Sequence, residues 1–363
     1  MSWDRHVCCR IAETTDKLEA WTDSLFNHNA SPQLIEPFLD KLATNDPSSA
    51  EPWVSKALGL PNLRTLGVCM IVKHYAPDSP LWSAASPHFK ECSYPIGIWV
   101  LQGNVKPKNA KELLKFPEPS VASSVAINLW RDNLTPQIPN ELLADWKNVI
   151  VEHVDDDHVL ASVFRENPDV AFRWITMRLE EIRTGAKSFF FGSKHDHAMP
   201  TAIEKLTREQ KRELISKMPR TYGVAELIRS LVGRDMELYE QLLAREELEG
   251  VRLDPLRLDG DFGPRGENVV HEFDEGWQRM AIAAMGKGFT EESIFSASQA
   301  GGFGWSGPMS SMFAARLAPF EKLLSHPDAR LRKVGKIGFD HYSAQRDSHL
   351  VHEKRAAVRG ELA

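Results

Sequence analysis

Cysteine is scarce in this chain of 363 residues, which has four thiols, at Cys8, Cys9, Cys69 and Cys92. No C-x-x-C pair is present, so the spacing that a cysteine zinc site needs is missing. The number and scatter of these cysteines do not make a disulfide framework, and direct neighbours in sequence rarely bond to each other. We therefore expect buried thiols without disulfides, in a reducing compartment.

Long apolar runs are also missing. Nowhere do about 18 apolar residues follow one another, the length that a membrane-spanning helix requires. The N-terminal stretch, MSWDRHVCCRIAE, lacks the basic-then-apolar pattern of a signal peptide. These absences predict a cytoplasmic protein that does not enter a membrane. The same stretch reads as a helix without the polar capping unit that repeat proteins need. We expect either that another domain or subunit covers this end or that the chain is part of something larger.

Charge of one sign does not dominate the composition. Acidic residues number 50 and Lys plus Arg 44, for a formal net charge of -6. This balance argues against a protein whose main task is to coat nucleic acid, although it allows a local basic face. The hydrophobic share of 42% and the charged share of 26% are typical of a globular chain.

Catalytic sequence motifs are missing as well. The sequence has no G-x-S-x-G, and no cysteine lies near a histidine in an electropositive setting. Gly302–Gly307 fits G-x-G-x-x-G, but no strand precedes it, so a tight connector between helices is favoured over a phosphate loop. We expect no catalytic residue and no cofactor, and the sequence favours binding over catalysis.

Helical periodicity is what the chain does have. In Tyr222–Val232 the apolar positions repeat at i, i+3, i+4, i+7 and i+8, which is one face of a helix. Thr207–Met218 opens with a capping-type Thr-Arg-Glu-Gln and stops at Pro219, and Glu141–His153 shows the same apolar spacing. The best strand candidate, Pro95–Leu101, is short and could equally close a helix. An all-α fold is predicted.

Two segments share a Pro-Asp pair with an arginine four residues past the aspartate: Pro327–Arg332 and Pro168–Arg173. Proline halts the preceding helix, and aspartate caps the next one. The arginine lies one turn into the second helix and can pair with a capping carboxylate nearby. This pattern resembles the HEAT repeat, in which a leucine-rich helix, a D-x-x-x-R turn and a second helix form one unit. The resemblance covers Ala314–Gln345 well and Val159–Arg183 fairly.

The resemblance implies an irregular HEAT-like α-solenoid of stacked antiparallel helix pairs. Two stretches, Thr184–Pro200 and Gly250–Gly276, read instead as long loop insertions. The predicted organisation is an N-terminal helical region (1–135), central helix-pair repeats (136–249), a loop insertion (250–276) and C-terminal HEAT-like repeats (277–363).

Solenoids present extended binding surfaces without active sites. The resemblance therefore implies a non-enzymatic scaffold or adaptor whose partner is another protein or a subunit of the same system. Proteins of this kind occur in multi-gene bacterial systems, anti-phage defence among them. We expect partner contacts at Phe262, Arg265, Trp277 and Trp305, because aromatic residues and arginine are favoured anchors at interfaces.

Basic residues near the C-terminus support an alternative function, nucleic-acid binding. The candidate phosphate contacts are Arg330, Arg332, Lys333, Lys336, Lys354, Arg355 and Arg359. A solvated outer face with pairs inside the helix explains the same residues.

A metal site is the third hypothesis. His195 and His197 form an H-x-H, and His153 and His158 flank three consecutive aspartates, 155–157. Histidine pairs with a carboxylate can hold zinc or manganese. The competing interpretation is that these aspartates begin a helix, where the helix dipole favours carboxylates.

Overall fold

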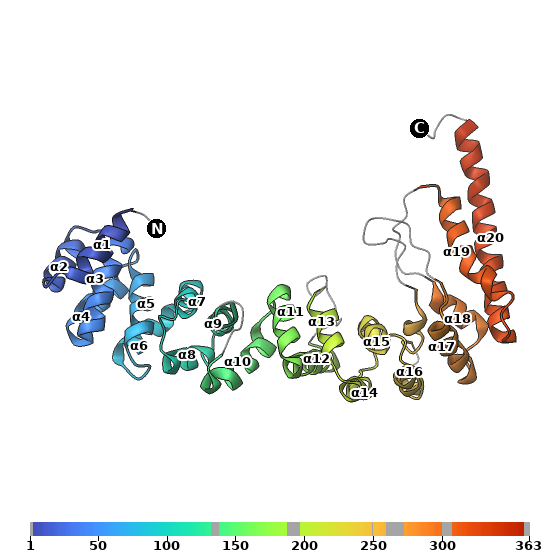
Figure 1. Cartoon of the computed structure of the whole chain (residues 1–363), viewed down its shortest axis with the longest axis horizontal. Helices are drawn as coiled ribbons and strands as arrows, with labels where there is room; N and C mark the ends of the chain where they lie inside the picture. Colours follow the sequence, from blue (N-terminus) through green and yellow to red (C-terminus); the bar gives the residue numbers. More distant parts are fainter. Residues whose placement is uncertain are drawn as a thin grey trace. The chain divides into compact units, whose positions relative to one another are not determined.

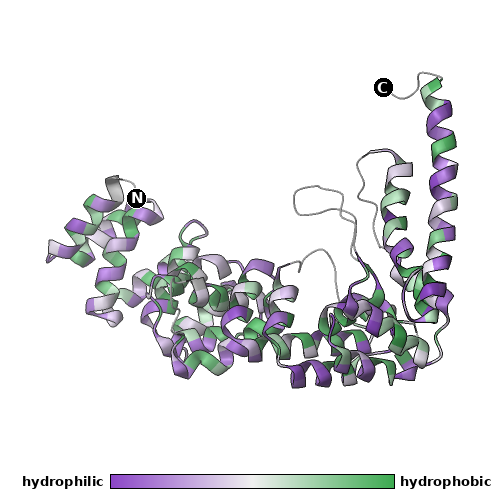
Figure 2. Ribbon diagram, turned by 45° about the vertical axis from the view of Figure 1, so that its right-hand side comes forward, coloured by the Kyte–Doolittle hydropathy of each residue, from purple (hydrophilic) through white to green (hydrophobic). Residues whose placement is uncertain are grey.

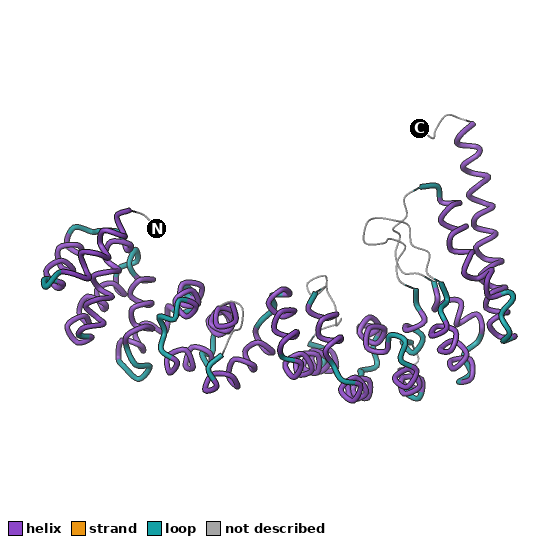
Figure 3. The backbone as a smooth tube through the Cα atoms, in the orientation of Figure 1, coloured by secondary structure: helices purple, strands orange, loops and turns teal. Residues whose placement is uncertain are grey.

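The computed structural model describes residues 3–131, 138–186, 197–248, 250–258, 272–299 and 307–358. Within these residues the chain forms helices α1–α20 and short 3-10 turns, and no strand (Figures 1 and 3). The all-α prediction is confirmed. The chain divides into two compact units, Met1–Val170 and Ala171–Ala363, and the division falls inside α12 (Pro168–Arg183).

The first unit consists of short helices joined by tight turns. In chain order they are α1 (Trp3–Thr14), α2 (Leu18–Asn27), α3 (Pro32–Asn45), α4 (Pro47–Gly59), α5 (Arg64–His74), α6 (Pro80–Ala85), the 3-10 turn η1 (Ser86–His88), α7 (Ser93–Leu101), α8 (Pro107–Leu114), α9 (Pro119–Arg131), α10 (Asn140–His153) and α11 (Asp157–Glu166).

Proline and capping residues explain where these helices begin. Pro32, Pro47 and Pro80 each stand at the start of a helix, where a missing N–H costs nothing and the fixed φ suits the first turn. Asp46 caps α4 by accepting the Ser48 N–H at 3.0 Å. The helix boundaries thus follow from local chemistry.

Helices of the first unit pack on their sequence neighbours and also on the next helix but one. α3 contacts α5, α5 contacts α7, and α7 contacts α9, while α8 contacts α10. Figure 1 shows α7 and α9 along one edge and α8 and α10 along the other. Two layers of alternating helices therefore form in the stretch from α7 to α10.

The core of the first unit is apolar and rich in aromatic side chains. Trp146 is fully buried, and its indole N–H donates to the Ala126 carbonyl at 3.0 Å. Trp130 stacks on it with ring centroids 5.4 Å apart. Cys69 and Cys92 are buried as well, and burial raises the pKa of both thiols, as expected for inert core cysteines.

The second unit contains the remaining helices. They are α13 (Ala198–Lys205), α14 (Arg208–Lys217), η2 (Tyr222–Val224), α15 (Ala225–Val232), α16 (Met236–Leu243), η3 (Glu246–Leu248), η4 (Asp254–Leu256), α17 (Glu275–Gly286), α18 (Glu291–Ser298), α19 (Met309–Leu323) and α20 (Ala329–Val358). Hydrophobic and hydrophilic residues alternate in bands along most of these ribbons (Figure 2).

In most places the helix boundaries predicted from the sequence agree with those observed in the second unit. The capping box at the start of α14 is present, because Thr207 and Gln210 satisfy each other's backbone N–H groups. The predicted helix Tyr222–Val232 is divided into the 3-10 turn η2 and α15. Pro95–Leu101, in the first unit, lies within the helix α7.

The predicted loops are partly helical where they are described. α13 already begins at Ala198, and α17 begins at Glu275, because Asp274 caps it by accepting the Trp277 N–H at 2.6 Å. The turn η4 also lies inside the second predicted loop. Residues 187–196 and 259–271 lie outside the described residues.

α19 and α20 form a long hairpin around the predicted Pro-Asp turn. Gly338 packs directly against the ring of Phe320: a Cβ at this position would lie 2.1 Å from its Cδ1. The predicted arginine pairing is wrong in one detail. Asp328 pairs with Arg330 at 2.9 Å, whereas Arg332 donates to the carbonyls of His326 and Pro327 at 2.8 Å. Arg330 is the closer cation, and Arg332 instead satisfies carbonyls of the turn between the two helices.

In the described part of the chain, no helix combines the length and the apolar character that crossing a membrane requires.

Candidate functional site

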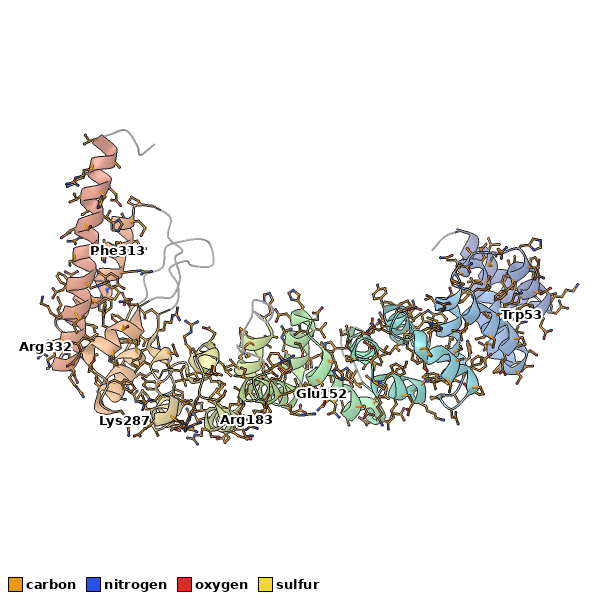
Figure 4. The ribbon with its side chains drawn as sticks, turned by 180° about the vertical axis from the view of Figure 1, so that it is seen from behind. Trp53, Glu152, Arg183, Lys287, Phe313 and Arg332 are labelled. Carbon is orange, nitrogen blue, oxygen red and sulfur yellow. The ribbon has the colours of Figure 1, made fainter. Side chains whose placement is uncertain are left out.

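The proximal basic residues of α20 each have a partner in the chain. Arg330 pairs with Asp328, Lys333 lies 3.3 Å from Glu291, and Lys336 lies 2.5 Å from Asp340. Figure 4 shows Arg332 near the start of α20. These charges are therefore largely compensated within the second unit.

The distal basic residues are exposed, as are Lys333 and Lys336. Lys354 and Arg355 lie in the last two turns of α20 with exposed side chains, and Arg359 lies outside the described residues. Exposed side chains thus lie along the described length of the predicted stripe, and near the turn Arg330, Lys333 and Lys336 pair with carboxylates.

The residues predicted to bind a partner are mostly outside the described part, which omits Phe262, Arg265 and Trp305. Trp277 is fully buried. Its indole N–H donates to the Leu256 carbonyl at 2.8 Å, and its ring lies 4.1 Å from that of Phe273. Trp277 is therefore a core residue that fixes η4 against α17.

The predicted metal ligands are dispersed along the chain. His153 ends α10 and His158 lies in the first turn of α11, both exposed. His197 precedes α13 in the second unit, and His195 is outside the described residues. Among the residues that the structure describes, no group of three or more His, Cys, Asp or Glu side chains is arranged to hold a metal ion. Asp156 caps α11 by accepting the Val159 N–H at 2.9 Å, as the competing interpretation expected.

A cluster of charged side chains that the sequence did not reveal joins α3 to α5. The Asp40 carboxylate lies 2.7 Å from the Lys73 ammonium and 2.6 Å from Nε2 of His74. Burial alone raises the pKa of Asp40, but hydrogen bonds from His74 and Lys73 outweigh it and hold the pKa below its ordinary value. Because these groups compensate one another, the cluster ties two helices together instead of presenting an activated nucleophile.

The C-terminal end of α5 is fixed from other helices as well. The buried amide of Asn109, on α8, donates to the carbonyls of Val72 and Tyr75 at 2.7 and 2.9 Å. The Tyr75 hydroxyl donates to the Pro47 carbonyl at 2.8 Å. Carbonyls at the end of α5 are thus satisfied by a side chain, and α3, α4, α5 and α8 meet at one rigid junction.

Next to this junction, α7 turns an apolar face outward. Tyr94, Ile98 and Leu101 follow one another at i, i+4 and i+7, which is one side of a helix. Tyr94 is 67% exposed, and the other two are partly exposed. These three residues are called the α7 surface below.

The neighbouring part of α7 is packed tightly on α9. A Cβ at Gly97 would lie 2.4 Å from Oγ of Ser124, so only glycine allows the two helices to approach this closely. Ile96 and Val100 are buried beside it. Gly97 stands between Tyr94 and Leu101 in the helical repeat, so α9 packs close beside the α7 surface.

A basic side chain contacts α7 at Trp99, which is not one of the three residues of the α7 surface. The Lys73 ammonium lies 5.5 Å from the ring centroid of Trp99, within the range of a cation–π contact. The sequence contained part of this signal, because Lys73 and His74 lie in the last turn of α5, where the helix dipole favours cations. The distant Asp40 could not be connected to them from the sequence alone.

The described residues form an all-helical protein in which α7 leaves Tyr94 exposed and Ile98 and Leu101 partly exposed. The sequence matches no protein-family model, no curated protein and no solved structure.

Proposed function

We propose that the chain is a non-enzymatic helical scaffold of the HEAT-like solenoid kind that binds another protein through the α7 surface. The exposure of Tyr94 on an otherwise apolar helix carries this proposal. The packing of α3, α5, α7 and α9 on next-but-one neighbours supports the stacked architecture, and stacked helices supply extended binding faces.

The α7 surface has the anatomy of an interface centre. Interfaces typically have an apolar, aromatic core and a polar rim, and tyrosine is enriched among the residues that dominate binding energy. Here Tyr94, Ile98 and Leu101 form the apolar part, and Lys73, which pairs with Asp40, contacts the same helix at Trp99. Covering the apolar part gains about 25 cal/mol for each Å² removed from water.

The close packing of α7 favours binding further. Glycine packing at Gly97 and the fixed end of α5 leave little to order when a partner arrives. A pre-organised face loses less conformational entropy on association than a loop does.

Affinity purification from the native host, with mass spectrometry of the eluate, tests the proposal. The wild-type chain should retain one protein in stoichiometric amount, and Tyr94→Ala should lose it. Trp21→Ala is the matched control, because Trp21 is an aromatic residue 43% exposed on α2, and it should retain the partner. Equal recovery with all three chains, or no protein partner with the wild type, contradicts the proposal.

Nucleic-acid binding is the weaker alternative. Arg330, Lys333 and Lys336 lie beside carboxylates, whose negative charge opposes that of a phosphate. The exposed distal part of α20 is addressed next.

A further inference from the structure

α20 has an inner face that is covered along most of its length. Near its start this face is buried against α18 and α19. Further along, the His349 ring lies 5.1 Å from that of Phe313 (labelled in Figure 4). At Glu353 the carboxylate accepts the Ser310 N–H at 3.0 Å and so caps the first turn of α19. One side of α20 is therefore occupied as far as Glu353.

The opposite side of the distal half is exposed to solvent. Its residues follow the helical repeat at i, i+3, i+7, i+11 and i+14: Ala344, Asp347, Val351, Arg355 and Val358. Val351 is 47% exposed and Val358 is 89% exposed. We call these five residues the outer face. Val351 and Val358 are thus two exposed apolar side chains on one side of α20, seven residues apart.

We propose that the outer face binds the outer face of a second copy of this chain, with the two α20 helices antiparallel and related by a two-fold axis at Val351. This inference goes beyond the proposed function and does not depend on the α7 surface. A two-fold interface uses the same patch on both copies, so the patch must complement itself.

The order of charges makes the outer face self-complementary in the antiparallel direction. Asp347 stands four residues before Val351, and Arg355 stands four residues after it. In an antiparallel pair centred on Val351, each Asp347 faces the Arg355 of the other copy. Ala344 then faces Val358, a small residue against a larger one. A parallel pair instead places like charges opposite each other, which is unfavourable.

The ion pair that Asp347 makes in the single chain does not prevent this contact. Its carboxylate accepts from Arg346 at 2.8 Å, with Asp347 63% exposed. Exposed pairs of this kind contribute little, so the carboxylate can exchange partners. The outer face is about 20 Å long, shorter than a standard interface needs. The dimer should therefore be weak and dependent on protein concentration.

Sedimentation velocity over a range of concentrations measures this association. The wild-type chain should shift from monomer to dimer as its concentration rises, and Val351→Glu should remain monomeric throughout. Asp347→Arg alone and Arg355→Asp alone should each remain monomeric, because each creates like-charge contacts in its own homodimer. Mixed in equal amounts, these two variants should form a heterodimer, since every facing pair is then opposite in charge.

Gln345→Arg is the matched control, because Gln345 is exposed on the same helix but off the outer face. It should dimerise like the wild type. Circular dichroism should show the same helical signal for all variants, which separates lost association from lost folding.

Three results would overturn the proposal. One is a wild-type chain that stays monomeric at every concentration. This result would overturn the proposal also if the monomer bound a DNA duplex probe through Lys354 and Arg355. Another is a dimer that Val351→Glu leaves intact. The third is a mixture of the two charge variants that stays monomeric although both are folded and the wild type dimerises.

Discussion

At the scale of single residues, two aspartates with opposite environments show how burial and partners compete. Asp40 has two cationic partners, and its pKa lies below the ordinary value. Asp254, on η4, has a buried Oδ2 without a hydrogen-bond partner. Burial raises its pKa to about 6, and the nearby Arg257 and Arg229 only partly oppose the rise.

Asp40→Asn should destabilise the first unit by about 1 kcal/mol at pH 7, since a partly exposed ion-pair cluster is lost. A lowered pKa in the folded state means that the stabilisation is present above the ordinary pKa of 3.8. It is lost as pH falls through the lower folded value. Chemical denaturation at several pH values should show the two proteins converging below about pH 4. Asp23→Asn, an exposed position on α2, should have no effect; a pH-independent deficit for Asp40→Asn contradicts the account.

Asp254→Asn should change the free energy of unfolding in the opposite direction and stabilise the fold. The folded pKa of about 6 lies above the ordinary 3.8, so the folded chain favours the protonated form. The native carboxyl therefore destabilises the fold progressively as pH rises from about 4 to 6. Allowing for partial exposure, the variant should be about 1 kcal/mol more stable than the wild type at pH 7.5 and nearly equal at pH 4.

Denaturant unfolding at these two pH values measures the difference for Asp254→Asn. Glu240→Gln removes a carboxylate from an exposed position on α16 and is the control. It should leave the free energy of unfolding unchanged at both pH values. Equal stability of Asp254→Asn and the wild type at pH 7.5 would show that Asp254 has a partner after all.

At the scale of helices, the sequence contained most of the information that determines where each helix begins and ends. It contained less of the information that determines which helices pack against each other. The capping box at Thr207 and the Pro-Asp turn at Asp328 are local features, so both were predictable. A short apolar segment such as Pro95–Leu101 suits a strand or a helix equally, and packing against α9 makes it a helix. The choice of Arg330 over Arg332 depends on side-chain geometry within one turn, which spacing does not reveal.

The hairpin of α19 and α20 gives a prediction about glycine. Gly338→Ala should cost about 1–3 kcal/mol, because a Cβ 2.1 Å from Cδ1 of Phe320 forces the ring or the helix to move. Gly286→Ala, near the end of α17 with nothing within 4 Å, should be neutral or stabilising by up to about 1 kcal/mol.

Thermal unfolding followed by circular dichroism compares the two glycine variants. Only Gly338→Ala should lower the midpoint. If both changes have the same effect, the close contact between α20 and Phe320 does not contribute to stability.

At the scale of the whole molecule, the all-α class followed from periodicity alone, whereas the contact surfaces did not. The α7 surface and the Asp40 cluster bring together α3, α5 and α7, which are far apart in sequence. Trp277 shows the reverse: a tryptophan expected at an interface is buried against Leu256. Composition indicates which residues suit a surface, and only tertiary packing determines which residues reach it.

Each unit has one face that we propose for association, on α7 in the first unit and on α20 in the second. The first is proposed to bind a different protein and the second to bind a copy of the same chain. Since the residues involved are different, loss of one contact should leave the other intact, and a partner bound at α7 would be displayed in two copies on a dimer.

The central claim is that the α7 surface binds a protein partner, and calorimetric titration of the recovered partner tests it most directly. Tyr94→Ala should weaken binding at least about tenfold, as expected when an interface anchor is truncated. Trp21→Ala should bind like the wild type, although loss of its stacking on buried Phe38 should lower its unfolding temperature. Tyr94→Ala should unfold at the wild-type temperature. Unchanged affinity for Tyr94→Ala, with the partner still bound one to one, would show that the contact lies elsewhere on the chain.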